Sequence, residues 1–255
     1  MHSMRVRTVA KQRMLPNMTI WQRLAAAASA SPLKGPLGAL LGGFGAASAA
    51  PHDEPPKADH EQVAFTIGFI ALCAKLAKAD GIVVNDEIEA FSELFKVAPE
   101  EADHVARFFN LAKQDSAGYE AYADQMASLL KHNQPLLQDV LECLCPIAAA
   151  EGVLHPAEAE FLESVARRFG FTDTEFRHIR ARFVPSDKRS PYDVLGVDPS
   201  IANDALKAQY RKLVSENHPD RAIARGVPKE FVVLANEKLA AINEAYNEIR
   251  KERGF

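Results

Sequence analysis

The sequence predicts an all-α protein, and three observations support this fold class. Apolar residues recur three or four positions apart along most of residues 60–255, and no run shows sustained alternation with a period of two. The 255 residues are 47% hydrophobic and 25% charged, as in a globular protein. Residues typical of helix boundaries flank the periodic segments: Gly81, Gly152 and Gly196 suit helix ends, and Pro156 and Pro191 suit helix starts.

Residues 1–59 are predicted to form an N-terminal tail. Within it, residues 24–50 carry one charge, Lys34, and are rich in alanine, glycine and serine. This stretch is long enough to span a bilayer, but its hydrophobicity is low for that role and two prolines interrupt it. We therefore treat it as a weak membrane segment, with a flexible low-complexity leader as the alternative. The proline-rich, charged residues 51–59 form the predicted linker.

Residues 60–185 are predicted to form a helical bundle. Six segments each place apolar residues on one helical face, and burial of these faces against one another would form the core. The faces are Phe65, Phe69, Leu72 and Leu76; Ile88, Phe91, Leu94 and Phe95; Val105, Phe108, Phe109 and Ala112; Met126, Leu129 and Leu130; Leu137, Val140, Leu141 and Leu144; and Phe161, Leu162, Val165 and Phe169.

An internal repeat lies within this bundle. The segment 77–82 (AKADGI) recurs at 148–153 (AAAEGV), so each unit reads as helix, acid–glycine turn, helix. The repeat aligns four acids that offer hard oxygen ligands to a divalent metal: Asp80, Glu87, Glu151 and Glu158. The alternative, which we favour, is that these acids stabilise helix ends, because the turns lack the alternating acids of an EF-hand loop.

Residues 186–255 are predicted to form a small helical domain built on a two-helix hairpin. Ser190 and Pro191 suit the start of a short opening helix, and Gly196 suits its end. Two longer helices follow, each with apolar residues at helical spacing. These residues are Leu206, Tyr210 and Leu213 in the first helix, and Ala235, Leu239, Ile242, Tyr246 and Ile249 in the second.

A short polar turn is expected to join the two longer helices. It contains His218, Pro219 and Asp220, and the first helix should end there because proline disfavours the α conformation of the residue before it. The turn would present an imidazole and a carboxylate at the tip of the hairpin. His218 and Asp220 alone could merely cap helix ends, and without a nearby nucleophile they do not form a catalytic acid–base constellation.

Four basic residues lie on the first of these helices and next to the turn. Lys207 and Arg211 lie four positions apart and share one helix face, and Lys212 and Arg221 extend the positive charge. Without further context, an ordinary solvated helix surface would explain all four residues.

Four motifs in sequence order make residues 190–255 resemble the J-domain of DnaJ-type co-chaperones. They are PYDVLGV at 191–197, YRKL at 210–213, HPD at 218–220 and INEAY at 242–246. The resemblance implies binding to a DnaK-type chaperone and stimulation of its ATP hydrolysis. It assigns the triggering motif to His218, Pro219 and Asp220, and the docking face to Lys207, Arg211, Lys212 and Arg221. It also implies a small core formed by Tyr192, Leu195, Tyr210, Leu213, Ile242 and Tyr246. The connection over residues 221–228, and the helix after it, are longer than in many J-domains.

The repeated helix–turn–helix unit resembles the TerB-like helical domain of tellurite-resistance proteins. The two domains in this order resemble the DjlA-like family of J-proteins. The resemblance implies a co-chaperone rather than an enzyme, in which the TerB-like domain selects a client protein, a partner or a second copy of the chain. The alternative is a metal-binding stress or envelope sensor whose J-like domain only docks. A hydrolase built on the acidic turns would lack a nucleophile.

Charge and cysteine content argue against several other classes. The formal net charge of −4 does not support nucleic-acid binding. Three cysteines, an odd number, argue against a disulfide framework, and no second thiol pair or histidine set completes a zinc site. We expect the cysteines to be small buried residues. We expect no cofactor, with the divalent metal in the TerB-like domain as the one alternative.

The expected location follows from the implied partner. A cytoplasmic DnaK-type partner requires the J-like domain on the same side, whereas the basic residues before position 24 would keep the N-terminus inside and send the rest of a spanning chain outward. Either residues 24–50 do not span, or the chain begins at Met18, which removes four of the five basic residues. The expected location is the cytoplasm, in association with the cytoplasmic face of the inner membrane.

Overall fold

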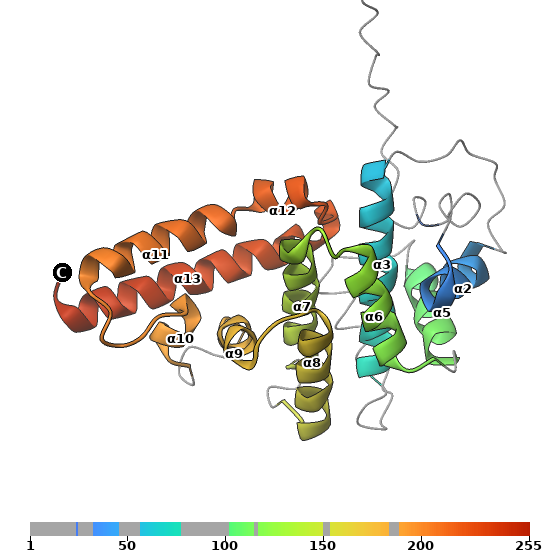
Figure 1. Ribbon diagram of the computed structural model, residues 1–255, viewed down its shortest axis with the longest axis horizontal. Helices are drawn as coiled ribbons and strands as arrows, with labels where there is room; N and C mark the ends of the chain where they lie inside the picture. Colours follow the sequence, from blue (N-terminus) through green and yellow to red (C-terminus); the bar gives the residue numbers. More distant parts are fainter. Residues whose placement is uncertain are drawn as a thin grey trace, which may run out of the picture.

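The computed structural model describes Leu24 and residues 33–45, 57–77, 102–114, 117–149, 154–183 and 189–255. Within these ranges the regular structure is helical and contains no strand, which confirms the all-α prediction. Figure 1 shows two parts, a bundle and a long hairpin that projects from its side.

The bundle contains the helices from the first three quarters of the chain. They are α2 (Gly35–Gly45), α3 (Lys57–Leu76), α5 (Ala102–Gln114), α6 (Tyr119–Leu129), α7 (Gln134–Ala148), α8 (Pro156–Arg168) and α9 (Asp173–Ala181). The second part, here called the hairpin domain, covers residues 189–255. It contains α10 (Pro191–Leu195), α11 (Asn203–Glu216), α12 (Pro219–Arg225), the 3-10 turn η3 (Lys229–Phe231) and α13 (Val232–Arg253).

Helix α3 lies at the centre of the bundle, where it contacts α2, α5, α6 and α7. Every residue over 63–74 is buried, so α3 is enclosed on all sides, beyond the single apolar face that the sequence predicted. Gly68 allows α6 to approach closely, because a Cβ at this position would collide with the side chain of Met126. The rest of the core is organised around this helix.

The other predicted apolar faces that lie within the described residues are buried, with one exception. The residues of the α5, α7 and α8 faces are each 2% exposed or less, which confirms those predictions. On α6 the prediction is wrong for Leu129, which is 41% exposed. Leu129 is the last residue of its helix, and the following Leu130 is the one that enters the core. The face predicted over residues 88–95 lies outside the described residues.

The stretch predicted as a weak membrane segment contributes to the bundle. Residues 35–45 form α2, which packs on α3, α5 and α6. Leu37, Leu40 and Leu41 are buried in the main apolar cluster, and the Leu37 N–H donates to Gln125 Oε1 of α6 over 2.9 Å. These leucines therefore pack against other helices of the bundle, so this part of the chain does not form a separate tail. Along the described ranges, no helix is both long and apolar enough to cross a membrane.

The hairpin domain has a small core formed by the residues that the sequence indicated. Leu195, Leu213 and Ile242 are buried in it, and Tyr192 packs against them. Tyr210 of α11 and Tyr246 of α13 stack with their ring centroids 3.9 Å apart. Helix α10 begins after Ser190 and ends at Gly196 with a φ of 63°, as predicted, although the Ser190 side chain makes no capping hydrogen bond.

The connection between α11 and α13 is not the short polar turn that the sequence predicted. Helix α11 ends at Glu216, as proline in the turn requires, but Pro219 then begins the further helix α12. Helix α12 ends at Gly226, which adopts a φ of 105°, and η3 leads from there into α13. This end of the hairpin lies against α7 of the bundle and does not project into solvent (Figure 1).

Residues of this long connection enter the core of the bundle. Ala222, Val227, Phe231 and Leu234 belong to the same buried cluster as α3 and α7. The Phe231 ring makes edge contacts with Phe65 and Phe69 of α3, at centroid distances of 5.2 and 5.1 Å. Part of the segment predicted as a separate domain over 186–255 therefore belongs to the core of the bundle, while the rest of that segment has the small core described above.

Candidate functional site

The residues His218, Pro219 and Asp220 form the first turn of α12 on the molecular surface. His218 is the N-cap, with a ψ of 136°, and Pro219 occupies the first helical position. The Asp220 N–H donates to His218 Nδ1 over 3.2 Å, so the imidazole does cap the helix. The side chains of His218 and Asp220 nevertheless remain 53% and 87% exposed, and Nδ1 lies 3.6 Å from Asp220 Oδ2. Capping and accessibility to a partner therefore coexist in the same two residues.

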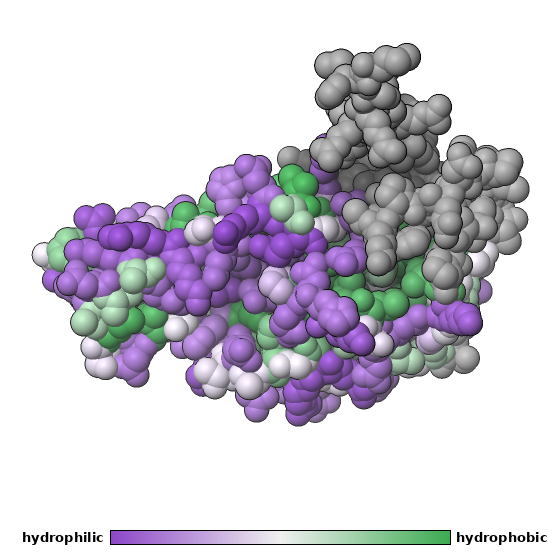
Figure 2. Space-filling view, turned by 45° about the horizontal axis from the view of Figure 1, so that its top comes forward, coloured by the Kyte–Doolittle hydropathy of each residue, from purple (hydrophilic) through white to green (hydrophobic). Residues whose placement is uncertain are grey.

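The four predicted docking residues lie on the surfaces of α11 and α12. The Lys207 side chain is 39% exposed, and its Nζ lies 3.9 Å from Asp204 Oδ1. The same Nζ lies over the Phe255 ring, 5.1 Å from the ring centroid. The side chains of Arg211, Lys212 and Arg221 are exposed. In Figure 2 the visible surface of the hairpin domain is largely hydrophilic, as expected for a face that meets solvent or a charged partner.

A groove separates part of this basic face from the bundle. Its volume is about 650 Å³, and it is lined by Lys212 and Arg221 from the hairpin domain and by Pro135 and Gln138 from α7. Lys207 and Arg211 are not among its lining residues. The structure thus brings two of the four predicted cations to the boundary between the two parts, and leaves the other two along α11.

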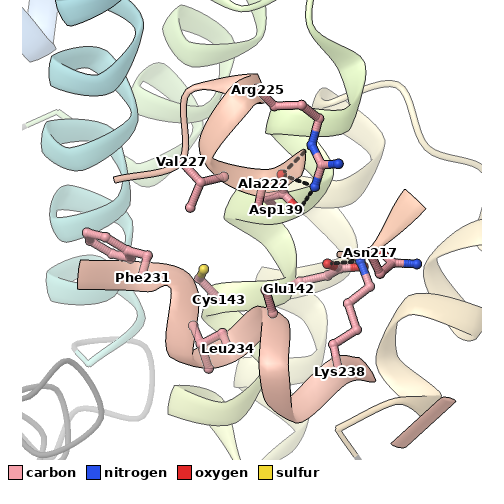
Figure 3. A pocket seen from close by; sticks show the side chains of 11 residues that line it. Asp139, Glu142, Cys143, Asn217, Ala222, Arg225, Val227, Phe231, Leu234 and Lys238 are labelled. Carbon is pink, nitrogen blue, oxygen red and sulfur yellow. Dashed lines mark hydrogen bonds and ion pairs between the residues drawn. The ribbon is translucent and has the colours of Figure 1, made fainter. Parts of the chain in front are cut away.

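Arg225, which the sequence analysis did not select, joins the end of α12 to the bundle. Its Nε and Nη2 donate to the two carboxylate oxygens of Asp139 in α7 over 2.8 to 3.0 Å (Figure 3). Its Nη1 donates to the Glu216 carbonyl over 2.8 Å. Asn133 Nδ2 donates to the Arg225 carbonyl over 2.8 Å. The Arg225 and Asp139 side chains are only 20% and 12% exposed. A charge-assisted, two-pronged contact of this kind fixes geometry as well as adding energy.

A second ion cluster lies deeper in the same boundary and centres on Glu142 of α7. Arg182 Nη1 donates to Glu142 Oε1 over 3.0 Å, and Lys238 of α13 pairs with Glu142 Oε2. All three side chains are at most 7% exposed. Arg182 also donates through Nε to the Val194 carbonyl of α10 over 3.3 Å. This cluster connects the bundle with both α10 and α13.

Burial and charge act in opposite directions on these groups. Burial alone would raise the pKa of Glu142. The positive charges of Lys238 and Arg182 lower this pKa by more than burial raises it, so the pKa lies below its usual value. Burial raises the pKa of Asp139 to about 6, although Lys238 and Arg225 oppose this shift. Burial likewise lowers the pKa of Lys238. Removing one partner of such a cluster leaves a buried charge uncompensated, which typically costs about 3–5 kcal/mol.

One sequence signal could have indicated the Glu142 cluster, but none indicated the Arg225 contact. Glu142 is a lone acid within the apolar run Leu141–Cys145 of a helix, and such a position requires a buried partner. Asp139 and Arg225 carry no comparable mark, since each belongs to a segment with ordinary polar residues. The contact between them joins positions 86 residues apart.

Of the four acids considered as metal ligands, Glu158 alone is among the described residues. Asp80, Glu87 and Glu151 lie outside the described residues. Glu158 is in the first turn of α8, where its carboxylate accepts a hydrogen bond from the His155 N–H over 2.8 Å and completes a capping box. This contact is the helix-start role that the alternative reading assigned to Glu158. In the part of the chain that the structure describes, no three His, Cys, Asp or Glu side chains are grouped as metal ligands would be.

The cysteine prediction is confirmed. Cys73, Cys143 and Cys145 are all buried, and none of the three forms a disulfide. Burial raises the pKa of Cys143 well above its usual value and that of Cys145 to about 12, so neither thiol ionises readily.

Two protein families match successive parts of the chain. Tellurite resistance protein TerB matches residues 66–181, and the DnaJ domain matches residues 190–253. The first match covers most of the bundle and the second covers nearly all of the hairpin domain. No solved structure matches the chain.

Several relatives, each named Co-chaperone protein DjlA, are similar to this chain over most of its length. A Co-chaperone protein DjlA from Photobacterium profundum is 29% identical over 244 residues, which cover 86% of each chain. One from Vibrio cholerae is 28% identical and covers 79% of this chain and 82% of its own. One from Coxiella burnetii is 28% identical and covers 71% and 74%. The chain therefore contains a TerB domain followed by a DnaJ domain, and along most of its length it is similar to the DjlA co-chaperones.

Proposed function

We propose that this protein is a J-domain co-chaperone that binds a DnaK-type chaperone and stimulates its ATPase. The observation that carries this proposal is the His218–Pro219–Asp220 motif, which stands exposed at the start of α12 within a matched DnaJ domain. The ATP chemistry belongs to the partner, so the protein supplies contacts and not a catalytic group.

Each candidate residue has a proposed role in this interaction. His218, Pro219 and Asp220 form the triggering motif, and their geometry is held by the first turn of α12. Lys207, Arg211, Lys212 and Arg221 form the docking face, because exposed cations attract an acidic surface and speed association. Raising the salt concentration should weaken this docking, since exposed charges are screened.

We further propose that the TerB domain determines where the chaperone acts. It would bind a client protein, a further partner or a second copy of the chain. We propose that the protein is located in the cytoplasm and, as a separate proposal, that it associates with the inner membrane. The DnaJ match and the relatives named as co-chaperones do not favour the alternative of a metal-binding sensor whose J-like domain only docks.

Single-turnover ATP hydrolysis by a DnaK-type chaperone tests the proposed function. The full chain should be used, because residues of the DnaJ domain are buried in the core of the TerB domain. We expect the wild type to accelerate hydrolysis, His218→Gln to abolish the acceleration, and the control His132→Gln, at an exposed histidine before α7, to retain it. Equal stimulation by His218→Gln, or none by the folded wild type, would contradict the proposal.

A further inference from the structure

The triggering motif is held from both sides by one guanidinium group. Arg225 donates to the Glu216 carbonyl, which lies two residues before His218, and Arg225 itself closes the short helix that begins at Pro219. The motif therefore lies between two points that the same side chain connects. Release of this guanidinium would remove the hydrogen bond that ties the end of α12 to the last residue of α11.

The TerB domain supplies the groups that hold Arg225 in place. Asp139 accepts hydrogen bonds at both carboxylate oxygens, and Asn133 donates to the Arg225 backbone carbonyl. Because Asp139 is only 12% exposed, solvent screens this contact much less than a surface ion pair. The two-pronged geometry restrains the guanidinium plane as well as its position.

Other contacts keep the two domains together without this pair. Phe231 packs between rings of α3, and the Glu142 cluster connects α7 with α10 and α13. Loss of the Asp139 carboxylate should therefore leave the domains associated while it releases Arg225. This separation makes a role in geometry distinguishable from a role in assembly.

We propose that Asp139 of the TerB domain is a positioning residue for the His218–Pro219–Asp220 motif and acts on it through Arg225. This inference rests on the proposed co-chaperone function and deepens it. It makes the TerB domain part of the machinery that sets the triggering conformation, in addition to its proposed choice of a client or partner. A chaperone bound at the motif thus meets a surface whose geometry a second domain determines.

The test is ATPase stimulation by full-length variants, with the maximal rate and the half-stimulating concentration measured separately. Asp139→Asn and Arg225→Gln should each lower maximal stimulation by roughly threefold to tenfold, since part of a charge-assisted hydrogen bond is lost. The half-stimulating concentration should change less, because the cations of α11 are untouched. The double variant should lose no more than Arg225→Gln alone, as expected when one residue acts through the other.

A control variant removes a more exposed aspartate–arginine pair elsewhere in the TerB domain. Asp124 of α6 accepts two hydrogen bonds from Arg168 of α8, each of 2.7 Å, away from α12. Asp124→Asn should therefore stimulate like the wild type. The inference is overturned if folded Asp139→Asn also stimulates like the wild type, or if the double variant shows the product of the two single losses. Should Asp139→Asn fail to fold, Arg225→Lys replaces it, because lysine keeps the charge but not the two-pronged contact.

A second readout separates this inference from the proposed function. The imidazole resonances of His218, assigned by comparison with His218→Gln, should shift in Asp139→Asn and not in Asp124→Asn. If the wild type gives no stimulation, the proposed function fails, and the His218 resonances alone decide the positioning role. Unchanged His218 resonances in folded Asp139→Asn would then overturn it.

Discussion

The substitution Phe231→Ala measures how strongly the DnaJ domain is built into the TerB core. Phe231 is 4% exposed and makes edge contacts with Phe65 and Phe69 of α3. Truncation of a buried phenylalanine costs about 3–5 kcal/mol, and each lost aromatic pair accounts for roughly 0.5–1.5 kcal/mol beyond area burial. The expected loss of about 4 kcal/mol is a large part of the roughly 5–15 kcal/mol that stabilises a typical domain.

Hydrogen exchange measured by mass spectrometry shows where this loss is felt. Phe231→Ala should accelerate exchange in α3 of the TerB domain, although the substitution lies in the DnaJ domain. The matched control is Ile249→Ala, because Ile249 is also buried but belongs to the separate core of the hairpin. Ile249→Ala should affect α11 and α13 more than α3. Unchanged exchange in α3 of folded Phe231→Ala would refute the contribution of Phe231 to the TerB core.

Two further predictions concern charge and metal. The pKa of Asp139 is raised from 3.8 to about 6, so between these values the folded chain binds more protons than the unfolded chain, and its stability falls as the pH rises through this window. The difference in the free energy of unfolding between Asp139→Asn and the wild type should therefore shift in favour of the variant by up to about 3 kcal/mol as the pH rises from about 3.5 to 6.5; urea titrations measure this shift, and a difference that stays constant with pH would contradict it. Calorimetry with calcium should show no binding, because the turns lack an EF-hand pattern; binding that is lost in Asp80→Asn/Glu151→Gln would show that the acidic turns hold metal.

Helix periodicity explains why most elements and much of the core were predictable. The faces containing Phe65, Phe108 and Leu137 are buried as expected, because residues three or four apart share one side of a helix whatever that helix packs against. The stacked Tyr210 and Tyr246 likewise follow from the two periodic helices of the hairpin. Leu129 was misplaced because helical spacing gives the side of the helix on which a residue lies, but not whether another element covers that position.

The surroundings of the site were less predictable. The apolar stretch that contains α2 is compatible with a membrane, a disordered leader or a protein core, and only the partners of Leu37 and Leu41 distinguish them. The residues after Asp220 were taken as a connection, yet they form α12 and bring Phe231 into the bundle. Seven residues of helix are too few for periodicity to identify, and such a short helix requires tertiary contacts for stability.

The sequence by itself determined the all-α class, the order of the two domains and the exposed His218–Pro219–Asp220 motif. Each of these depends on residues close together along the chain, where the spacing of side chains and the geometry of proline act directly. Only the tertiary structure decided that Arg225 meets Asp139, that Lys238 meets Glu142, and that part of the DnaJ domain enters the core of the TerB domain. The two ion pairs join residues 86 and 96 positions apart, and all of these contacts depend on packing shape and desolvation, which local patterns do not encode.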